Sequence, residues 1–539
     1  MNIGFWAEKQ EEPVFAPVEV AIAAKVVRQP VTVVKHPSQP AVGIGFGGEY
    51  LSQPNPGQTA YPIIGMLPPL YPEWLGDRSF QEIHNVRFAY VGGAMARGIA
   101  SANLVIALAK SGCMGFFGSA GLSLERLQNE INTIKAALAP EGLSWGMNLI
   151  HTPNEPQLEF NIVDLYLRND VRKIEAAAFM SLSANIVYYA FKGLTQNADG
   201  SVKRHNHVFA KISRPEVAVH FLSPVPTTIV DELVSRGLLT PEEARLSRNL
   251  PIAEDITIES DSGGHTDNRP LGPLFSSIAS LRDQLCEQYN YPVKPRLGAA
   301  GGLGTPLAVA AAYGMGAAYV CVGSVHQSCV ESGVSAAAKK MLESAGIADF
   351  ALTACADMFE QGVKVQVLKK GTMMPQRGNY LYKLYTTYSG LDSLPPNEVA
   401  KLEKEIFRMP LASVWDETEK FFTRVEPSQV SRAHSDPKHK MALVFRWYIG
   451  KSSQWPIQQM DDRQLDYQIW AGPAIGAFNQ WVKGTFLEKV ENRQVGVVAL
   501  NLLEGAAIIT KAQQLRTFGV DISESSFQYK PEQLQLSAN

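Results

Sequence analysis

Two glycine-rich segments have the composition of phosphate-binding loops. They read GAAGGLGTP (298–306) and VGSVHQ (322–327), and each follows a short apolar run. Glycines let main-chain N–H groups approach a ligand closely, and a following helix N-terminus favours an anion. We therefore interpret Gly302, Gly323 and Ser324 as candidates to hold a cofactor phosphate. The alternative is that these glycines only form tight turns.

A histidine follows a third pair of glycines. The segment ESDSGGHTDN (259–268) places Gly263 and Gly264 directly before His265. Imidazole is the side chain best able to give or take a proton near neutral pH. The pattern predicts an active-site histidine on a tight turn, although a lone histidine is more often structural.

Three further features are suited to a flat, redox-active ring. VGGAMARG (91–98) has small residues that would let main chain lie against such a ring. Asn148, in GMNLIHTP, and Lys211, in FAKIS, could bind the carbonyls and N1 region of a flavin, where positive charge favours the reduced anion. Turn packing and structural roles are the competing interpretations.

Other sites are not favoured. Gly43, Gly45 and Gly48 form a GxGxxG, but QPNPG follows where a dinucleotide-binding motif needs a helix. His205 and His207 alternate on one strand face without a third ligand at metal-like spacing, so we expect no metal site. GxSxG, Walker A and Ser/His/Asp arrangements are not evident.

The elements that must position these residues alternate between short strands and amphipathic helices. This alternation is typical of a parallel sheet covered by helices. About 250 residues with eight such units predict a closed (β/α)8 barrel of the α/β class, with its chemistry at the carboxyl ends of the strands. The phosphate candidates follow the seventh and eighth strands, where this fold often binds phosphate. The predicted strands are 87–93, 114–120, 144–151, 173–179, 207–213, 255–261, 295–302 and 317–324.

The flanks differ from this central region. Residues 1–85 form a Pro- and Gly-rich accessory segment, expected to be a loop-rich arm or a small accessory domain. We place the barrel domain at 86–375 and a C-terminal helical domain at 376–539, where mixed-charge helical patterns dominate. Tyr380, Tyr382, Tyr385 and Tyr388 lie near this second boundary, and we interpret them as interface or core packing, with a substrate surface as the alternative.

The amino-acid composition argues against several classes of function. The 539 residues are 45% hydrophobic, and 49 Lys+Arg nearly balance 52 Asp+Glu, so no basic stripe indicates a nucleic-acid partner. The N-terminus does not have the pattern of an export signal, and five cysteines without a CxxC pair fit a reducing compartment, so we expect a cytoplasmic protein. No charged residue occurs between Arg296 and Glu331, but glycines break this stretch, so we expect no membrane span.

Taken together, these motifs resemble a known superfamily. VGGAMA, MGFFGSAG, GMNLIHTP, ESDSGGH, AAGGLGTP and VCVGS, in this order, look like the nitronate monooxygenases and flavin-dependent enoyl reductases, which are FMN-binding TIM barrels. With the leader and AGPAIGAFNQWVKGTFLE (471–488), the chain is most similar to the PfaD family. That family comprises enoyl-reductase subunits of polyunsaturated fatty acid synthases and trans-acting polyketide enoyl reductases.

The resemblance implies a set of site residues. His265 matches the superfamily's active-site histidine, but Asp261-Ser262 replace the Glu-Ala that often precedes Gly-Gly-His, which leaves the exact role of the histidine open. The residues implied to bind FMN are Gly93, Ala94, Met95, Asn148, Lys211, Gly263 and Gly264, with Gly301, Gly302, Gly323 and Ser324 at its phosphate.

The resemblance also implies a reaction. An enoyl reductase of this kind would use NADPH or NADH to reduce a 2-enoyl thioester on acyl carrier protein, alongside other synthase subunits and with a homodimer as one expected form. A nitronate monooxygenase-type flavin oxygenase is one alternative. A non-catalytic docking subunit of a multienzyme assembly is the other.

Overall fold

Eight parallel strands close into a barrel in the computed structural model, which describes residues 4–9 and 11–534. Each strand lies inside its predicted range, and the predicted (β/α)8 fold is confirmed. Their side chains are buried on both faces, as expected for apolar runs in a helix-covered parallel sheet. In barrel order they are β6 (Tyr90–Gly92), β7 (Met114–Phe117), β8 (Gly146–Ile150), β9 (Lys173–Ala177), β12 (His207–Ile212), β13 (Asp255–Glu259), β15 (Arg296–Ala300) and β16 (Tyr319–Val322).

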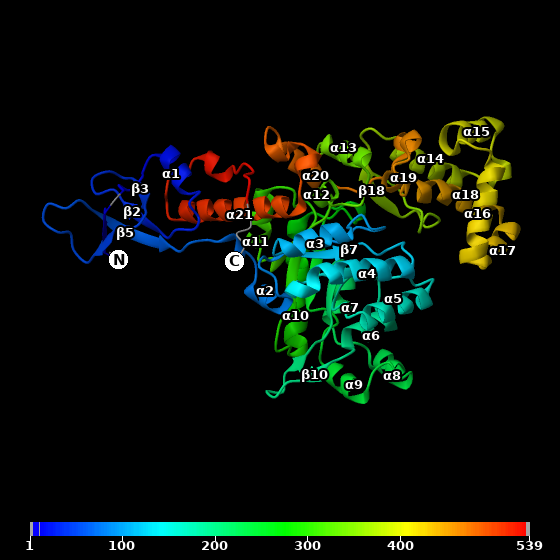
Figure 1. Ribbon diagram of the computed structural model, residues 1–539, viewed down its shortest axis with the longest axis horizontal. Helices are drawn as coiled ribbons and strands as arrows, with labels where there is room; N and C mark the ends of the chain where they lie inside the picture. Colours follow the sequence, from blue (N-terminus) through cyan, green and yellow to red (C-terminus); the bar gives the residue numbers. More distant parts are fainter. Residues whose placement is uncertain (1–3, 10, 535–539) are drawn as a thin grey trace.

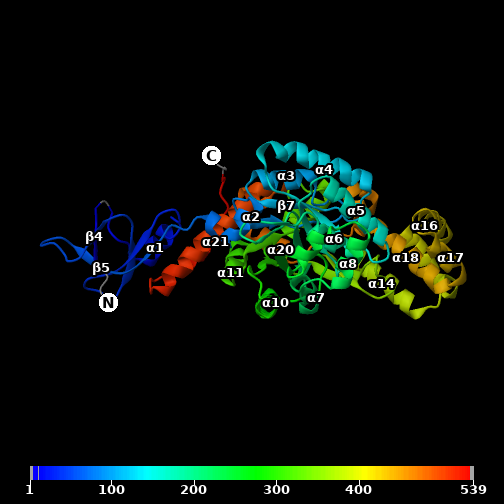
Figure 2. The same cartoon turned by 90° about the horizontal axis from the view of Figure 1, so that it is seen from below.

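Helices cover the outside of the barrel (Figures 1 and 2). In α4 the buried residues Leu127, Ile131, Ile134 and Leu138 recur every three or four positions, and this spacing gives one apolar stripe against the strands. The covering helices are α3 (Ala102–Lys110), α4 (Leu124–Leu138), α5 (Pro156–Arg168), α6 (Ala184–Phe191), α7 (Pro215–Leu222), α8 (Thr227–Ser235), α9 (Pro241–Ser247), α10 (Leu271–Tyr289), α11 (Pro306–Gly314) and the short α12 (Ser324–Gln327). A hairpin of β10 (Thr195–Gln196) and β11 (Val202–Lys203) extends from the amino-terminal end of β12.

The amino-terminal end of the barrel is plugged by α2 (Arg78–His84). Phe80 is fully buried and stacks on Tyr319 with ring centroids 4.5 Å apart. Beneath it, Asp255 pairs with His84 at 2.8 Å and with Arg296 at 2.7 Å. This end of the barrel is therefore filled by packed side chains and paired charges.

The N-terminal segment is more regular than the sequence predicts. Instead of an irregular leader, it contains a five-stranded antiparallel sheet with Trp6 fully buried. The domain bounds stay a prediction. The prolines in this segment indicate loops, so the sequence did not predict its short strands, several of which lie between turns. Gly43 and Gly45 lie on β3, not on a strand-to-helix turn. The elements are β1 (Phe5–Ala7), α1 (Pro17–Ala23), β2 (Val31–Lys35), β3 (Val42–Gly45), β4 (Glu49–Leu51) and β5 (Ala60–Leu67).

At the other end of the molecule, helices form the yellow and orange lobe of Figure 1. A small sheet joins this lobe to the barrel, because β14 (Gly264–His265) pairs with β18 (Lys364–Leu368), which pairs with β17 (Phe350–Ala354). The four tyrosines noted above pack against the core. The lobe's helices are α14 (Met374–Thr387), α15 (Pro396–Lys401), α16 (Leu411–Val425), α17 (Pro427–Ser435), α18 (Pro437–Ser452) and α19 (Trp455–Gln458). Two further helices, α13 (Ala336–Glu343) and α20 (Ala474–Val482), lie nearer the barrel, and α20 contacts α12 (Figure 1).

The last long helix, α21 (Val495–Thr517), returns to the barrel and packs against α11 and α3. It is long and apolar enough to cross a membrane, but 83% of its most apolar window is buried inside the structure. Its apolar character is therefore explained by core packing.

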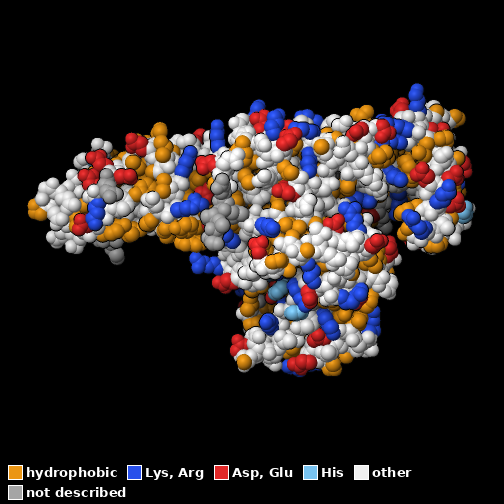
Figure 3. All heavy atoms as spheres, in the orientation of Figure 1, with side chains coloured by type: hydrophobic (Ala, Val, Ile, Leu, Met, Phe, Trp, Pro, Cys, Tyr) orange, Lys and Arg blue, Asp and Glu red, His pale blue; other side chains and the backbone are white. Residues whose placement is uncertain are grey.

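On the face drawn in Figure 3, Lys and Arg side chains are interspersed with Asp and Glu.

Candidate active site

A pocket opens at the carboxyl ends of the barrel strands. It contains about 630 Å³ of empty space, part of it open to solvent. Nine of the eleven predicted cofactor residues line it, the exceptions being Asn148 and Gly264. The nine are Gly93, Ala94, Met95, Lys211, Gly263, Gly301, Gly302, Gly323 and Ser324.

The glycines after β15 and β16 leave room on one side of this pocket. Gly302 has φ +71°, and a Cβ built there or at Gly323 would have no neighbour within 4 Å. Gly301 has φ +87°, and its Cβ would lie 2.4 Å from Ser260 Oγ. Only glycine adopts this left-handed loop without strain. The loop therefore keeps open the space in which a ligand's phosphate would lie.

A buried layer of charges forms the floor of the pocket. Lys211 Nζ lies 2.9 Å from Glu259 Oε1, and Glu175 on the neighbouring strand β9 is 1% exposed. Burial alone would lower the pKa of Lys211, but Glu259 and Glu175 outweigh it and the pKa is raised. Burial raises the pKa of Glu175, against the opposing effect of Lys211. Lys211 is thus a permanent cation at the pocket.

Glu175 also fixes the loop after the first strand. Its Oε2 accepts the main-chain N–H of Ala94 at 2.9 Å, and its Oε1 accepts the Cys321 thiol at 3.8 Å. Sequence reasoning missed Glu175. The signal was a single carboxylate inside the apolar strand KIEAAAF, which a buried strand tolerates only when the charge is partnered.

Asn148 lies on β8 but does not line the pocket. Its Nδ2 donates to the main-chain oxygen of Glu175 at 2.9 Å, and the residue is 6% exposed. The side chain therefore holds β8 to β9. Its role as a flavin ligand stays a prediction.

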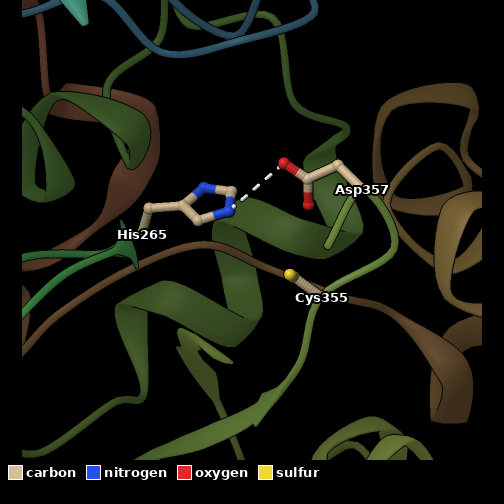
Figure 4. Close-up of side chains that lie close together, drawn as sticks. All are labelled: His265, Cys355 and Asp357. Atoms are coloured by element: carbon tan, nitrogen blue, oxygen red, sulfur yellow. Dashed lines mark ion pairs between the residues drawn. The ribbon is translucent and has the colours of Figure 1, made fainter. Parts of the chain in front are cut away.

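His265 lies beside the pocket and not in its lining. It is on β14, and its Nε2 lies 3.3 Å from Oδ2 of Asp357, in the segment after β17 (Figure 4). Burial lowers the pKa of the imidazole, but the hydrogen bond and charge of Asp357 outweigh it and the pKa is raised. Burial also opposes ionisation of Asp357, yet His265 lowers its pKa to about 2. With side chains 45% and 58% exposed, the pair can reach a bound substrate.

Cys355 lies close to this pair. The potential ligand atoms of His265, Cys355 and Asp357 are all within 4.8 Å of one another. Burial raises the pKa of the Cys355 thiol to about 12. That the protein has no metal site remains a prediction.

A distant segment completes the pocket wall. Trp470, Gly472 and Ala474 line it, and the Gly472 N–H donates to Ser324 Oγ at 3.0 Å. A Cβ at Gly304 would lie 2.0 Å from the main-chain oxygen of Ala474, so only glycine allows this close approach. Trp470 Nε1 is buried and has no hydrogen-bond partner among the described residues, which leaves one donor for a ligand. In the sequence analysis, residues 471–488 contributed to the family resemblance, but they were not predicted to line the site.

Comparison with known families separates the chain into two matched regions. Residues 78–381, more than half of the chain, match the nitronate monooxygenase family. Residues 388–467 match a second family, the inserted helical domain of acyl-carrier-protein S-malonyltransferase. The second match covers the lobe that contains α15–α18.

Curated relatives include a synthase subunit and a polyketide biosynthesis protein. The chain is 45% identical, over 85% of its length, to one of the polyunsaturated fatty acid synthase subunits of a Thraustochytrium species, and covers 31% of that protein. It is 41% identical, over 81% of its length, to the polyketide biosynthesis protein PksE of Bacillus subtilis, and covers 56% of it. The chain thus spans between about a third and a half of these two relatives.

Among solved structures, the enoyl reductase domain of MlnA, from the macrolactin biosynthesis cluster of Bacillus amyloliquefaciens, superimposes with a TM-score of 0.79. It is 38% identical, and the match covers 83% of this chain and 99% of that one. This similarity supports an oxidoreductase. The chain therefore belongs to the nitronate monooxygenase family, and within it to the PfaD-like enoyl reductases.

Proposed function

We propose that the chain is an FMN-dependent enoyl reductase that uses NADPH or NADH to saturate a 2-enoyl thioester carried on acyl carrier protein. The observation that carries the proposal is the pocket at the barrel mouth, where an open glycine cradle faces a buried lysine. The similarity to a solved enoyl reductase domain supports the same reaction.

The residues present fit FMN. Gly302 and Gly323 leave open space for a phosphate, and Gly93 and Ala94 present little side chain on the adjoining part of the wall, where the Gly93 N–H donates to Val322 O at 3.0 Å. Lys211 supplies positive charge where reduced flavin gains negative charge. Trp470 Nε1 offers an unpaired donor. When bound, FMN would carry hydride from the nicotinamide to the substrate.

The chain's own groups have separate tasks in this reaction. Saturation of a 2-enoyl thioester adds a hydride at the β-carbon and a proton at the α-carbon, while charge develops on the thioester oxygen. His265, whose protonated form is favoured by Asp357, is assigned to give that proton or to polarise the oxygen. Trp470, Gly472 and Ala474 form one wall of the pocket.

The proposed partners follow from the relatives. Those relatives are subunits or proteins of fatty acid and polyketide assemblies. We assign the carrier-bound thioester as substrate and other synthase subunits as neighbours of this chain. The family match to a malonyltransferase that acts on acyl carrier protein supports a carrier-linked substrate as well.

The test starts with purified protein reconstituted with FMN. We expect a yellow protein whose colour is bleached by NADPH or NADH without oxygen and restored by a crotonyl thioester on acyl carrier protein. A protein that refuses FMN contradicts the proposal. The family match favours one second candidate, a nitronate monooxygenase. Oxygen-dependent consumption of a nitronate, with no response to the enoyl thioester, would establish that candidate instead.

A further inference from the structure

A second cavity, with about 970 Å³ of empty space, part of it open to solvent, lies between the barrel mouth and the helical lobe. We call it the α16–α18 groove. From the barrel side it is lined by Arg97, Ala356 and Asp357. The lobe contributes residues of α16 and α18, namely Glu417, Thr418, Phe421, Phe422, Leu443, Arg446, Trp447, Gly450 and Lys451, and Gln454 beyond α18.

The groove is joined to the flavin pocket at two points. Arg97 is two residues beyond Met95, so one loop lines both cavities. Asp357 lines the groove and pairs with His265, which is two residues beyond the pocket residue Gly263. A ligand in the groove can therefore extend past the His265–Asp357 pair toward the reacting centre.

Three cations in the groove have no carboxylate partner. Among the described residues, no hydrogen bond or ion pair reaches the side chains of Arg97, Arg446 or Lys451. Arg446 and Lys451 lie only over the rings of Phe422 and Trp447, at 5.8 Å and 5.7 Å. Unpaired cations that converge on one cavity favour an anionic ligand.

The two acids of the groove, by contrast, are already engaged. Glu417 Oε2 accepts the indole N–H of Trp447 at 3.0 Å, and Asp357 is held by His265. With Asp357 paired to His265, Glu417 is the one carboxylate of the lining left to offset the three cations. The groove therefore keeps a net positive charge.

Arg97 is held in place by its backbone. It has φ +60°, a left-handed conformation that is costly for a long side chain. Its N–H donates to the oxygen of Ala120, which fixes that conformation. Burial without a counter-charge lowers the pKa of its guanidinium. A strained arginine kept in a cavity without a partner is expected where it meets a ligand.

The remaining wall is apolar. Phe421 is 49% exposed, although a large aromatic side chain gains by burial, and Phe422, Leu443 and Trp447 adjoin it. Few neutral polar groups are free, since the Thr418 hydroxyl already donates to Val414 O at 2.7 Å. The lining thus suits a ligand with one anionic end and a long, weakly polar body, and offers little to the hydroxyl-rich sugars of a dinucleotide.

We infer that the α16–α18 groove binds the phosphopantetheine arm of the carrier-bound thioester, with its phosphate on Arg97, Arg446 and Lys451 and its acyl end directed toward His265. This inference rests on the proposed function for the identity of the substrate. It adds the place where the substrate's prosthetic arm enters.

The test measures binding, so that it does not depend on turnover. The ligands are S-butyryl-4′-phosphopantetheine, which is already saturated, and S-butyrylpantetheine, which lacks the phosphate. Isothermal titration of the FMN-loaded protein compares the unmodified chain with Arg446→Gln/Lys451→Gln. The matched control is Lys420→Gln, an exposed lysine on α16 that does not line the groove. Circular dichroism checks that each variant is folded.

We expect the double variant to lose affinity for the phosphorylated ligand by about tenfold or more, because two charge-assisted contacts are removed. Affinity for S-butyrylpantetheine should change less than twofold, and Lys420→Gln should match the unmodified chain. Arg97→Asn, which keeps a residue tolerant of left-handed backbone, should give the same selective loss.

Two results would overturn the inference. Equal affinities of the unmodified chain and both variants for the phosphorylated ligand would show that the cations do not bind its phosphate. Weaker binding of NADPH with unchanged phosphopantetheine binding would assign the groove to the nicotinamide dinucleotide. Failure of the unmodified chain to reduce a crotonyl thioester would remove the proposed function, and the titration would still report whether the arm binds here.

Discussion

The carboxylate of Glu175 accepts the main-chain N–H of Ala94 at 2.9 Å and so ties the fourth barrel strand to the loop that follows the first. The same carboxylate lies in the field of Lys211, whose own pairing partner is Glu259. One buried side chain thereby sets both the shape of the pocket wall and the charge beneath it.

Replacing Glu175 should therefore cost stability as well as cofactor affinity. In Glu175→Leu the Ala94 N–H loses its acceptor and Lys211 loses one of two neighbouring carboxylates, and leaving a buried donor unpaired costs about 1–3 kcal/mol. We expect a lower melting temperature and weaker FMN binding, measured by thermal denaturation and fluorescence titration. Glu175→Gln keeps an acceptor and is the matched control. Equal losses of melting temperature and FMN affinity in both variants would mean that the negative charge of Glu175, and not its hydrogen bond to Ala94, stabilises the site.

Lys211→Met tests the cation of the pocket floor. Removing the charge that favours reduced flavin should slow anaerobic bleaching by NADPH by about tenfold or more, since each 1.4 kcal/mol changes a rate tenfold. Because the pKa of Lys211 is raised, the unmodified protein should show no loss of bleaching from its deprotonation near neutral pH. Stopped-flow traces of the two proteins decide this. Identical bleaching rates would contradict the role given to Lys211.

Gly302→Val tests the phosphate cradle. A branched side chain at φ +71° strains the loop and projects into space that has no protein neighbour within 4 Å. The variant should purify without yellow colour and take up FMN poorly. The control is Gly314→Ala, a glycine of α11 whose added Cβ also meets nothing within 4 Å but whose backbone is helical. Full colour in Gly302→Val would place the phosphate elsewhere.

The barrel and its glycine loops could be predicted because their signals are local. Each strand is an apolar run bounded by turn residues, and Gly301 and Gly302 follow β15 directly. Glu175 could not be assigned, since its role depends on the neighbouring strand that supplies Lys211 and on the loop that brings Ala94. Such pairings exist only once the barrel has closed.

The segment from Trp470 to Ala474 was missed for a related reason. It is about 150 residues beyond Ser324 along the chain, yet the Gly472 N–H contacts that side chain. The N-terminal sheet was underestimated because its strands are short and lie among prolines, which normally indicate loops. Asp357, after β17, gave no signal that it would partner His265.

That partnership gives the last prediction, on pH dependence. A general acid works while it is protonated, so the rate falls as pH rises through its pKa. Asp357 raises the pKa of His265, against the effect of burial. Removing the charge in Asp357→Asn should therefore lower that pKa and move the alkaline fall in kcat/KM to lower pH. The rate well below both pKa values should change little.

The matched experiments separate this positioning role from a structural one. His265→Ala should slow reduction of the carrier-bound enoyl thioester by about 10²–10⁴-fold while FMN stays bound, and it should abolish the alkaline limb. Asp357→Asn added to His265→Ala should then have no further effect, because the carboxylate acts through the imidazole. Profiles measured from about pH 5 to 9 cover the range in which histidine titrates. Asp357 does not set the protonation of His265 if the alkaline fall in kcat/KM stays at the same pH in Asp357→Asn. The same conclusion follows if the two substitutions reduce kcat/KM additively in the double variant.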